Sequence, residues 1–170
     1  MTRVLILGRF QPPHVGHLNV IEAEGGKADH VIVVIGSAQA SYTTQNPFTA
    51  GERIEMLHAA LEARGVTNAL LIPIFDLNRH AEWVAYVESL VPPFDEVVSN
   101  NPLTHELFEA KGYKVRSAPW HRRRDASGTK IRERLEAGKD ITDVVDPSVA
   151  KIIKRLRAQK RMQRIREDSH

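Results

Sequence analysis

Two histidines near the start of the chain have the type and spacing of residues that act on a bound anion. His14 and His17 follow an apolar run of strand length that ends at Gly8, after which two prolines turn the chain. A helical pattern begins at about His14 and continues to Glu24, which places both histidines on one face. The free N–H groups of a helix N-terminus attract anions, and Gly16 leaves room for a ligand to approach the backbone. The pattern predicts a phosphate site that carries its own catalytic side chains.

Two other interpretations of this histidine pair are open. His-x-x-His can form half of a zinc site, but structural zinc sites usually use cysteine and the sequence has none, so we expect no metal site here. Either histidine could instead be an ordinary helix-surface residue. The combination of strand end, arginine, double proline and helix start favours the phosphate site, because motifs gain weight from such context. Neither a Gly-x-Gly-x-x-Gly fingerprint nor a P-loop ending is present, so the phosphates must be held differently.

Strands and helices are expected to alternate along the chain. Apolar or β-branched runs predict strands at 4–8, 31–35, 70–74, 96–99 and 114–116, and helical patterns occupy 14–24, 49–63, 80–90, 102–111, 128–137 and the residues from 147 onward. This order is typical of an α/β, Rossmann-like doubly wound parallel sheet of about five strands with C-terminal helices. Ligands bind such folds beyond the carboxyl ends of the strands, and every candidate site segment follows a predicted strand.

A second predicted helix N-terminus lies near position 128. The hydroxyls of Ser127 and Thr129 are suited to hold phosphate oxygens, and Arg132 lies one turn further along. A simple helix cap is the alternative for this segment. Neighbouring basic residues favour a triphosphate cradle, although a run of arginines can equally form a solvated loop; these residues are Arg122, Arg123, Arg124 and Lys130.

Length and composition are those of a soluble globular protein. With 170 residues, 42% hydrophobic and 26% charged, the chain is expected to form one domain over 1–170, without a membrane span or signal peptide, and to be cytoplasmic. The net charge of +3 is uneven, because residues 151–170 carry +6 and the rest carries −3. The basic helical tail, about 147–170, has a loose apolar stripe and no stacking aromatic. We therefore expect it to pack on the body or on a neighbouring subunit rather than to bind nucleic acid.

Four segments resemble one enzyme family. The stretch Gly8-Arg9-Phe10-Gln11-Pro12-Pro13-His14-Val15-Gly16-His17 is similar to the His-x-Gly-His signature of the nucleotidyltransferase superfamily, in the form seen in archaeal-type nicotinamide-nucleotide adenylyltransferases. Ser127-Gly128-Thr129-Lys130-Ile131-Arg132 resembles the second element of the superfamily, with Ala126 where isoleucine is more usual. Segments 36–39 (Gly-Ser-Ala-Gln) and 46–53 (Asn-Pro-Phe-Thr-Ala-Gly-Glu-Arg) also resemble the archaeal branch, and the resemblance extends to about Leu156.

The resemblance implies transfer of AMP from ATP to nicotinamide mononucleotide (NMN), which yields NAD and pyrophosphate. Mg²⁺ would enter with ATP and be held mostly by phosphates and water. The implied catalytic residues are His14 and His17 as donors to the phosphates, with His17 nearer the α-phosphoryl group, and Arg9 and Arg132, which neutralise the β and γ phosphates. The residues implied in ATP binding are Gly8, Arg9, Phe10, Gln11, His14, Gly16, His17, Ser127, Gly128, Thr129 and Arg132. Those implied in NMN binding are Ser37, Phe48, Thr49, Arg53, Asp76, Trp83 and Asn101.

Several of these roles have alternatives. Trp83 is expected to stack on the cationic nicotinamide ring, whereas a core position is the alternative for it and for Trp120. Arg53 is the best candidate for the phosphate and ribose of NMN, or else a surface helix arginine. Asp76 contacts this half-site or caps a helix.

Other functions share the same two motifs. Adenylyl transfer to flavin mononucleotide or phosphopantetheine, or cytidylyl transfer, differs only in the acceptor pocket, and Trp83 with segment 46–53 favours NMN. A nucleotide-sensing module without turnover is the alternative from another class, against which the intact His14, His17 and Arg132 argue. Because archaeal relatives include hexamers, the resemblance also implies a homo-oligomer, with a hexamer as one form.

Overall fold

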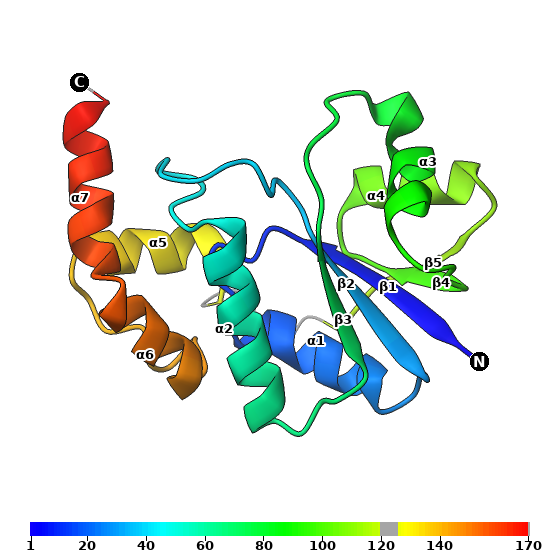
Figure 1. Cartoon of the computed structure of the whole chain (residues 1–170), viewed down its shortest axis with the longest axis horizontal. Coiled ribbons are helices and arrows are strands. Elements are labelled where there is room, and N and C mark those ends of the chain that lie inside the picture. The colour runs from blue at the N-terminus through cyan, green and yellow to red at the C-terminus, as the bar shows by residue number, and fades with distance from the viewer. Residues whose placement is uncertain (120–125, 170) are drawn as a thin grey trace.

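A parallel β-sheet forms the centre of the protein. The computed structural model describes residues 1–119 and 126–169, and within them five strands are present: β1 (Arg3–Gly8), β2 (His30–Ile35), β3 (Ala69–Pro73), β4 (Glu96–Val98) and β5 (Lys114–Arg116). Their order is β3-β2-β1-β4-β5, with every pairing parallel. The predicted Rossmann-like sheet is confirmed. The chain places β2 and β3 on one side of β1 and then β4 and β5 on the other side, so the strand order reverses between β1 and β4 (Figure 1).

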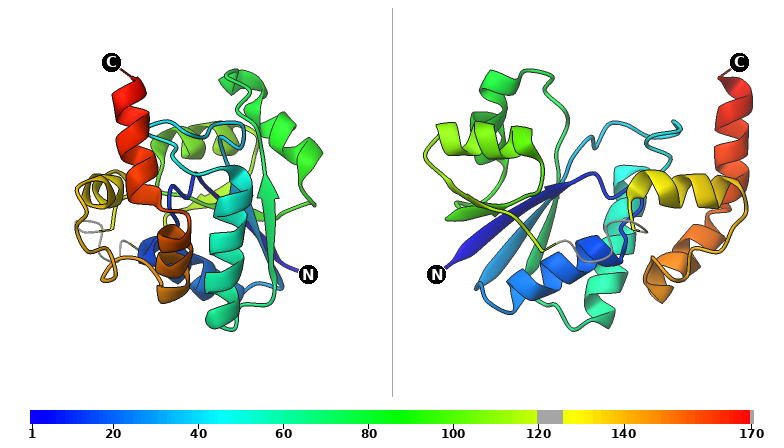
Figure 2. Two further views of the ribbon diagram at one scale, coloured as in Figure 1. Left: turned by 60° about the vertical axis from the view of Figure 1, so that its left-hand side comes forward. Right: turned by 180° about the vertical axis from the view of Figure 1, so that it is seen from behind.

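Helices cover both faces of this sheet (Figures 1 and 2). On one face lie α1 (Val15–Gly25), α2 (Ala50–Ala63), α5 (Gly128–Glu136), α6 (Pro147–Arg155) and α7 (Ala158–Asp168); on the other lie α3 (His80–Leu90) and α4 (Pro102–Ala110). Alternation along β1 explains the two cores, because Val4 and Ile6 join the larger cluster while Leu5 joins the smaller. The sheet is therefore covered on both sides, which is why the central strands β1 and β2 are apolar along most of their length, whereas the edge strand β5 carries Lys114 and Arg116.

The basic tail is two helices that pack against the body. Arg157, between α6 and α7, has φ 52° and ψ 45°, in the left-handed region, and this residue redirects the chain so that α7 leaves at an angle to α6 (Figure 2). Ile152, Ile153 and Met162 are buried in the larger core. Of the two expected positions for the apolar stripe, packing on the body is observed, and contact with a neighbouring subunit stays a prediction.

Within residues 1–119 and 126–169, no helix has both the length and the apolar character needed to cross a bilayer.

Candidate active site

A cleft of about 430 Å³ opens where β1 and β4 end, at the point where the strand order reverses. Its wall combines the ends of β1 and β4, the start of α1 and the start of α5, segments that are far apart in the sequence. The described residues that line it are Ile6, Leu7, Phe10, His14, Gly16, His17, Val20, Val98, Ser99, Asn100, Asn101, Ala118, Pro119, Ala126, Ser127 and Gly128. Two of the resemblance motifs thus contribute to one cavity.

The two histidines build the start of α1 between them. His14 is the N-cap, one residue earlier than the first helical residue, and its Nδ1 accepts hydrogen bonds from the backbone N–H of Gly16 (3.1 Å) and His17 (3.4 Å). In return, the His17 Nδ1 accepts from the His14 N–H (3.3 Å). The arrangement is a capping box made of imidazoles, and it stacks the two rings with centroids 3.7 Å apart. The two histidines that line the cleft are therefore the same residues that cap the start of α1.

These hydrogen bonds fix the protonation of both rings. An imidazole nitrogen that accepts carries no proton, so in the neutral ring the proton lies on Nε2. Burial lowers the pKa of His14 to about 4, and burial followed by the charge of His14 holds the pKa of His17 well below its usual value. Both histidines therefore enter the cleft as neutral rings whose Nε2–H groups are the donors left for a ligand.

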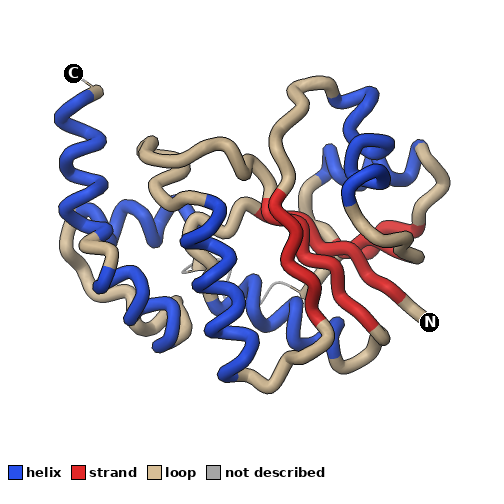
Figure 3. The backbone as a smooth tube through the Cα atoms, in the orientation of Figure 1, coloured by secondary structure: helices blue, strands red, loops and turns tan. Residues whose placement is uncertain are grey.

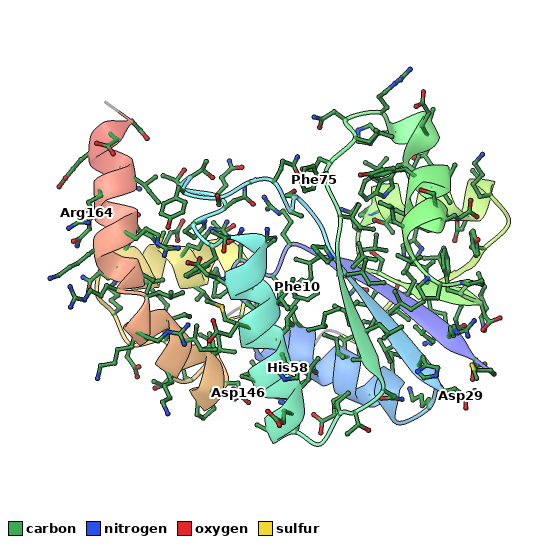
Figure 4. The ribbon with its side chains drawn as sticks, viewed as in Figure 1. Phe10, Asp29, His58, Phe75, Asp146 and Arg164 are labelled. Carbon is green, nitrogen blue, oxygen red and sulfur yellow. The ribbon has the colours of Figure 1, made fainter. Side chains whose placement is uncertain are left out.

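The turn between β1 and α1 is held from inside the protein. Phe10 has φ 53°, the Gln11–Pro12 peptide bond is cis, and the Phe10 ring, labelled in Figure 4, meets the edge of His17 with centroids 4.7 Å apart. The buried side chain of Gln11 donates to the Phe48 carbonyl (2.9 Å) and accepts from the Phe48 N–H (3.0 Å). Gln11 was expected to bind ATP, but its side-chain amide is occupied by this brace.

Arg132 joins the second motif to the first. Ser127 is the N-cap of α5, and its hydroxyl accepts from the Lys130 N–H (3.2 Å). One turn later, the buried Arg132 donates through Nη1 to the Gln11 carbonyl (2.9 Å) and through Nη2 to the Thr129 hydroxyl (3.3 Å). The N-termini of α1 and α5 therefore meet at the same cleft, where both attract negative charge.

Positive charge is concentrated near these helix starts. The pKa values of Arg53 and Arg132 are lowered first by their own burial and second by the positive charge of Arg9, which is exposed. The guanidinium groups are thus close enough to repel one another. A bound anion would relieve that repulsion.

Two residues expected to contact NMN are buried supports. The Phe48 ring is fully buried in the larger core. Arg53 is also fully buried, and burial lowers its pKa to about 10. Its guanidinium donates to the carbonyls of Arg9 (2.8 Å), Gly36 (2.9 Å) and Ser37 (3.1 Å), and its Nε donates to the Thr49 carbonyl (3.2 Å). Direct contact of either side chain with NMN stays a prediction, whereas the bonds of Arg53 tie together the loops after β1 and β2.

The other residues expected at the NMN half-site lie in several places. The Ser37 hydroxyl donates to the Asp76 carboxylate (2.7 Å), which joins the loops after β2 and β3; next to it Phe75 is 60% exposed (Figure 4). Thr49 is the N-cap of α2, in the predicted capping box with Glu52. Asn101 caps α4 and lines the cleft itself.

Trp83 lies on α3, half-buried. It packs against the smaller core, with the Tyr86 ring 5.9 Å away between centroids. The core alternative accounts for the covered part of its surface, and stacking on a ligand stays a prediction. Trp120, Arg122, Arg123 and Arg124 lie outside the residues that the structure describes.

Some lining residues were not among the expected site residues. The apolar wall formed by Ile6, Leu7, Val20 and Val98 comes from strand ends and from the α1 turn after His17. Strand ends are recognisable in the sequence, so this part of the wall had a signal. The brace between Gln11 and Phe48 had none, because it joins segments 37 residues apart through an amide and a main chain.

The described residues that line the cleft include no carboxylate. None of the described lining residues is Asp or Glu, and the described chain contains no group of three His, Cys, Asp or Glu side chains placed to share a metal ion. A divalent cation that arrives with substrate phosphates needs no such group.

Comparison with known proteins narrows the class that the fold and cleft define. Residues 5–134 match the family model described as Cytidylyltransferase-like. The nicotinamide-nucleotide adenylyltransferase of Picrophilus torridus is 48% identical over 151 residues, which cover 89% of each chain. That of Pyrococcus furiosus is 46% identical over 165 residues, or 95% of this chain and 88% of the relative. This chain belongs to the cytidylyltransferase-like family and, within it, to the nicotinamide-nucleotide adenylyltransferases.

Solved structures agree on the fold. A bifunctional NMN adenylyltransferase/ADP ribose pyrophosphatase from Francisella tularensis, complexed with AMP and a Mn ion, superimposes with a TM-score of 0.78 at 18% identity. The match covers 99% of this chain and 53% of that one, so this chain spans about half the length of the Francisella protein. At this identity the likeness supports the fold alone.

Proposed function

We propose that this protein transfers AMP from ATP to nicotinamide mononucleotide, producing NAD and pyrophosphate. The nicotinamide-nucleotide adenylyltransferases that are 46–48% identical to this chain support the reaction. The structural observation that carries it is the hydrogen bond from Arg132 to the Gln11 carbonyl, which brings the second motif against the histidine turn in one cleft. Two helix N-termini and neutral histidine donors suit a polyphosphate.

ATP is assigned to this cleft as its magnesium complex. The triphosphate would lie between the starts of α1 and α5, near Gly8, Gly16, Gly128 and the hydroxyls of Ser127 and Thr129, with the base toward the apolar wall. The metal belongs to the substrate in this assignment, because the described lining offers only neutral groups.

The reaction needs alignment and charge stabilisation more than acid–base chemistry. The 5′-phosphate of NMN is already ionised at neutral pH, so it attacks the α-phosphorus of ATP without a general base. A phosphorus–oxygen bond forms as the bond to the β-phosphate oxygen breaks, and pyrophosphate leaves. We assign the Nε2–H of His17 to the α-phosphoryl oxygens, that of His14 to the neighbouring phosphates, and Arg9 and Arg132 to the leaving pyrophosphate.

The NMN half-site is assigned to the loops after β2 and β3. The Ser37–Asp76 pair and Thr49 provide polar groups there, and Trp83 is proposed to stack on the nicotinamide ring. Arg53 and Phe48 contribute by fixing the loop that presents these groups. Their role is indirect.

Pyrophosphate release with ATP and a panel of acceptors tests the proposal. The acceptors are NMN, nicotinic acid mononucleotide, flavin mononucleotide and phosphopantetheine, each at equal concentration with Mg²⁺ present. We expect the highest kcat/KM with NMN or its acid analogue. A higher value with either of the other acceptors would replace NMN, and ATP binding without turnover on any acceptor would support the nucleotide-sensing alternative.

Three further expectations belong to the same proposal. The protein is taken to be cytoplasmic, where ATP and mononucleotides are available, to form one domain with a basic tail, and to assemble as a homo-oligomer. Gel filtration with light scattering measures the last of these, and a monomer at micromolar concentration would contradict it.

A further inference from the structure

The last helix is attached to the loop between β2 and α2 through one side chain. Arg161 of α7 donates to both carboxylate oxygens of Glu52 (2.7 and 2.8 Å) and to the Pro47 carbonyl (3.1 Å). Its guanidinium also lies over the Tyr42 ring, 4.6 Å from the centroid. Figure 3 shows this long loop extending from the sheet toward α7. The guanidinium thus contacts the loop at its outer turn and at its return to α2.

The groups that Arg161 holds define the local geometry of the loop. The Glu52 carboxylate that it pairs with also accepts from the Thr49 N–H (2.9 Å), and the Thr49 hydroxyl accepts from the Glu52 N–H (3.1 Å). These bonds set where α2 begins. The next residue, Arg53, carries the ties to the Gly36 and Ser37 carbonyls at the other end of the loop. Arg161 is therefore the outermost member of a chain of contacts that reaches Ser37.

A neighbouring ion pair shows what an ordinary surface contact between the tail and α2 looks like. Arg155 of α6 binds both oxygens of Glu55, at 2.7 Å each, but its side chain is 58% exposed and that of Glu55 is 46% exposed. Arg161 and Glu52 are only 13% and 16% exposed, and Arg161 also binds a loop carbonyl. Exposed pairs contribute little, whereas a covered charge with several partners holds them in place. Both are bidentate Arg–Glu pairs, and they differ in whether the loop is involved.

The Arg161 contact concerns the proposed acceptor half-site and not the ATP cleft. No described residue of the loop, 36–49, lines the ATP cleft, and Phe48 at the loop's inner end is held independently by Gln11. Losing the Arg161 contact would therefore release the loop on the side of Ser37 and Thr49 while the histidine turn stays fixed.

We propose that Arg161 is a positioning residue for the acceptor half-site, which it orders by holding the loop at Pro47 and Glu52. The inference rests on the proposed function, since it assigns the mononucleotide to that side of the loop. The C-terminal helix is then part of the machinery that binds the acceptor, although it contributes no group to the ATP cleft.

The test compares Arg161→Met, Arg161→Lys and the matched control Arg155→Met in the full chain. Initial rates are measured with ATP and NMN varied separately, together with the thermal unfolding midpoint. We expect Arg161→Met to raise the KM for NMN by about tenfold, a loss on the scale of a small displacement of a binding group, with kcat and the KM for ATP changed by less than about twofold. Arg161→Lys should recover part of the loss, because lysine keeps the charge but not the bidentate geometry. Arg155→Met should behave as the unaltered protein.

Each outcome decides the inference. A lower unfolding midpoint for Arg161→Met with an unchanged KM for NMN would make the contact merely structural, and an equal rise in Arg155→Met would show that any tail contact suffices. Should Arg161→Met fail to fold, Glu52→Gln removes the same ion pair while keeping an oxygen for the Thr49 N–H, and the same KM shift is expected. If the unaltered protein turns over NMN and the Arg161 and Glu52 variants have the same KM for NMN, only this role of Arg161 is overturned. Unaltered protein without turnover overturns the proposed function as well.

Discussion

Replacing His17 with alanine tests whether the imidazole pair is chemical or only structural. The substitution removes the Nε2–H that we assign to the α-phosphoryl group and the Nδ1 that accepts from the His14 N–H. Loss of one preorganised donor typically lowers kcat by about 10²–10³, or about 2.7–4 kcal/mol of transition-state stabilisation. Loss of the cap contact lowers the free energy of unfolding by about 1 kcal/mol. A domain stable by about 5–15 kcal/mol stays folded after that loss, so unfolding cannot account for a hundredfold effect.

Two further substitutions separate the ring's two nitrogens. The amide of His17→Gln reaches the position of Nε2, whereas that of His17→Asn stays near Nδ1. We therefore expect the glutamine variant to keep more kcat and the asparagine variant to keep more thermal stability. Steady-state pyrophosphate release and urea unfolding measure the two effects on the same samples. Turnover of His17→Ala within about threefold of the unaltered protein, or higher turnover in the asparagine than in the glutamine variant, would refute the assignment.

Three predictions concern stability. Burial lowers the pKa of His14 to about 4, from 6.5 in the unfolded chain, so the unfolded state binds more protons between these two pH values. The free energy of unfolding should therefore fall by up to about 3 kcal/mol as pH drops from 6.5 to 4. Urea titrations of the unaltered protein and of His14→Asn at several pH values measure the difference. Arg53→Met leaves four carbonyls of the loops after β1 and β2 without their buried donor and should cost about 3–5 kcal/mol in the same assay. Arg157→Val places a β-branched side chain at φ 52° and should cost about 1–2 kcal/mol, while Arg157→Gly should not destabilise, as thermal unfolding would show.

These stability predictions fail in different ways. Equal acid sensitivity of the unaltered protein and His14→Asn would show that His14 is not buried as a neutral ring. An Arg53→Met protein as stable as the unaltered one would mean that the loop carbonyls find water or new partners. Valine tolerated at position 157 would place that residue outside the left-handed region in solution.

The fold could be predicted because its signals are local. The first three strands are short apolar runs next to turns, and the Thr49–Glu52 capping box marks the start of α2 within four residues of sequence. The histidine turn is equally local, since its bonds join residues three apart or fewer. Where the bonding partner is a near neighbour, residue type and spacing were enough.

The buried supports could not be predicted in the same way. Arg53 resembles any helix arginine in sequence, and its burial depends on the loops after β1 and β2 converging on it, which only the strand order determines. Phe48 was expected at the ligand because it lies in a motif, but it fills the core beneath that motif. The break at Arg157 has neither glycine nor proline to mark it. In each case long-range packing overrides the local preference.

The bond between Arg132 and the Gln11 carbonyl has a consequence for when the protein becomes able to bind ATP during its synthesis. Its partners are separated by 121 positions, so the nucleotide cavity has only one wall until the ribosome has delivered the residues up to Arg132. A nascent polypeptide that has formed its first strands and α1 already has the paired imidazoles but no opposing grip on a triphosphate. Affinity for ATP should then rise once α5 has been synthesised and has packed against the histidine turn, so that shorter nascent chains bind little of the cell's ATP.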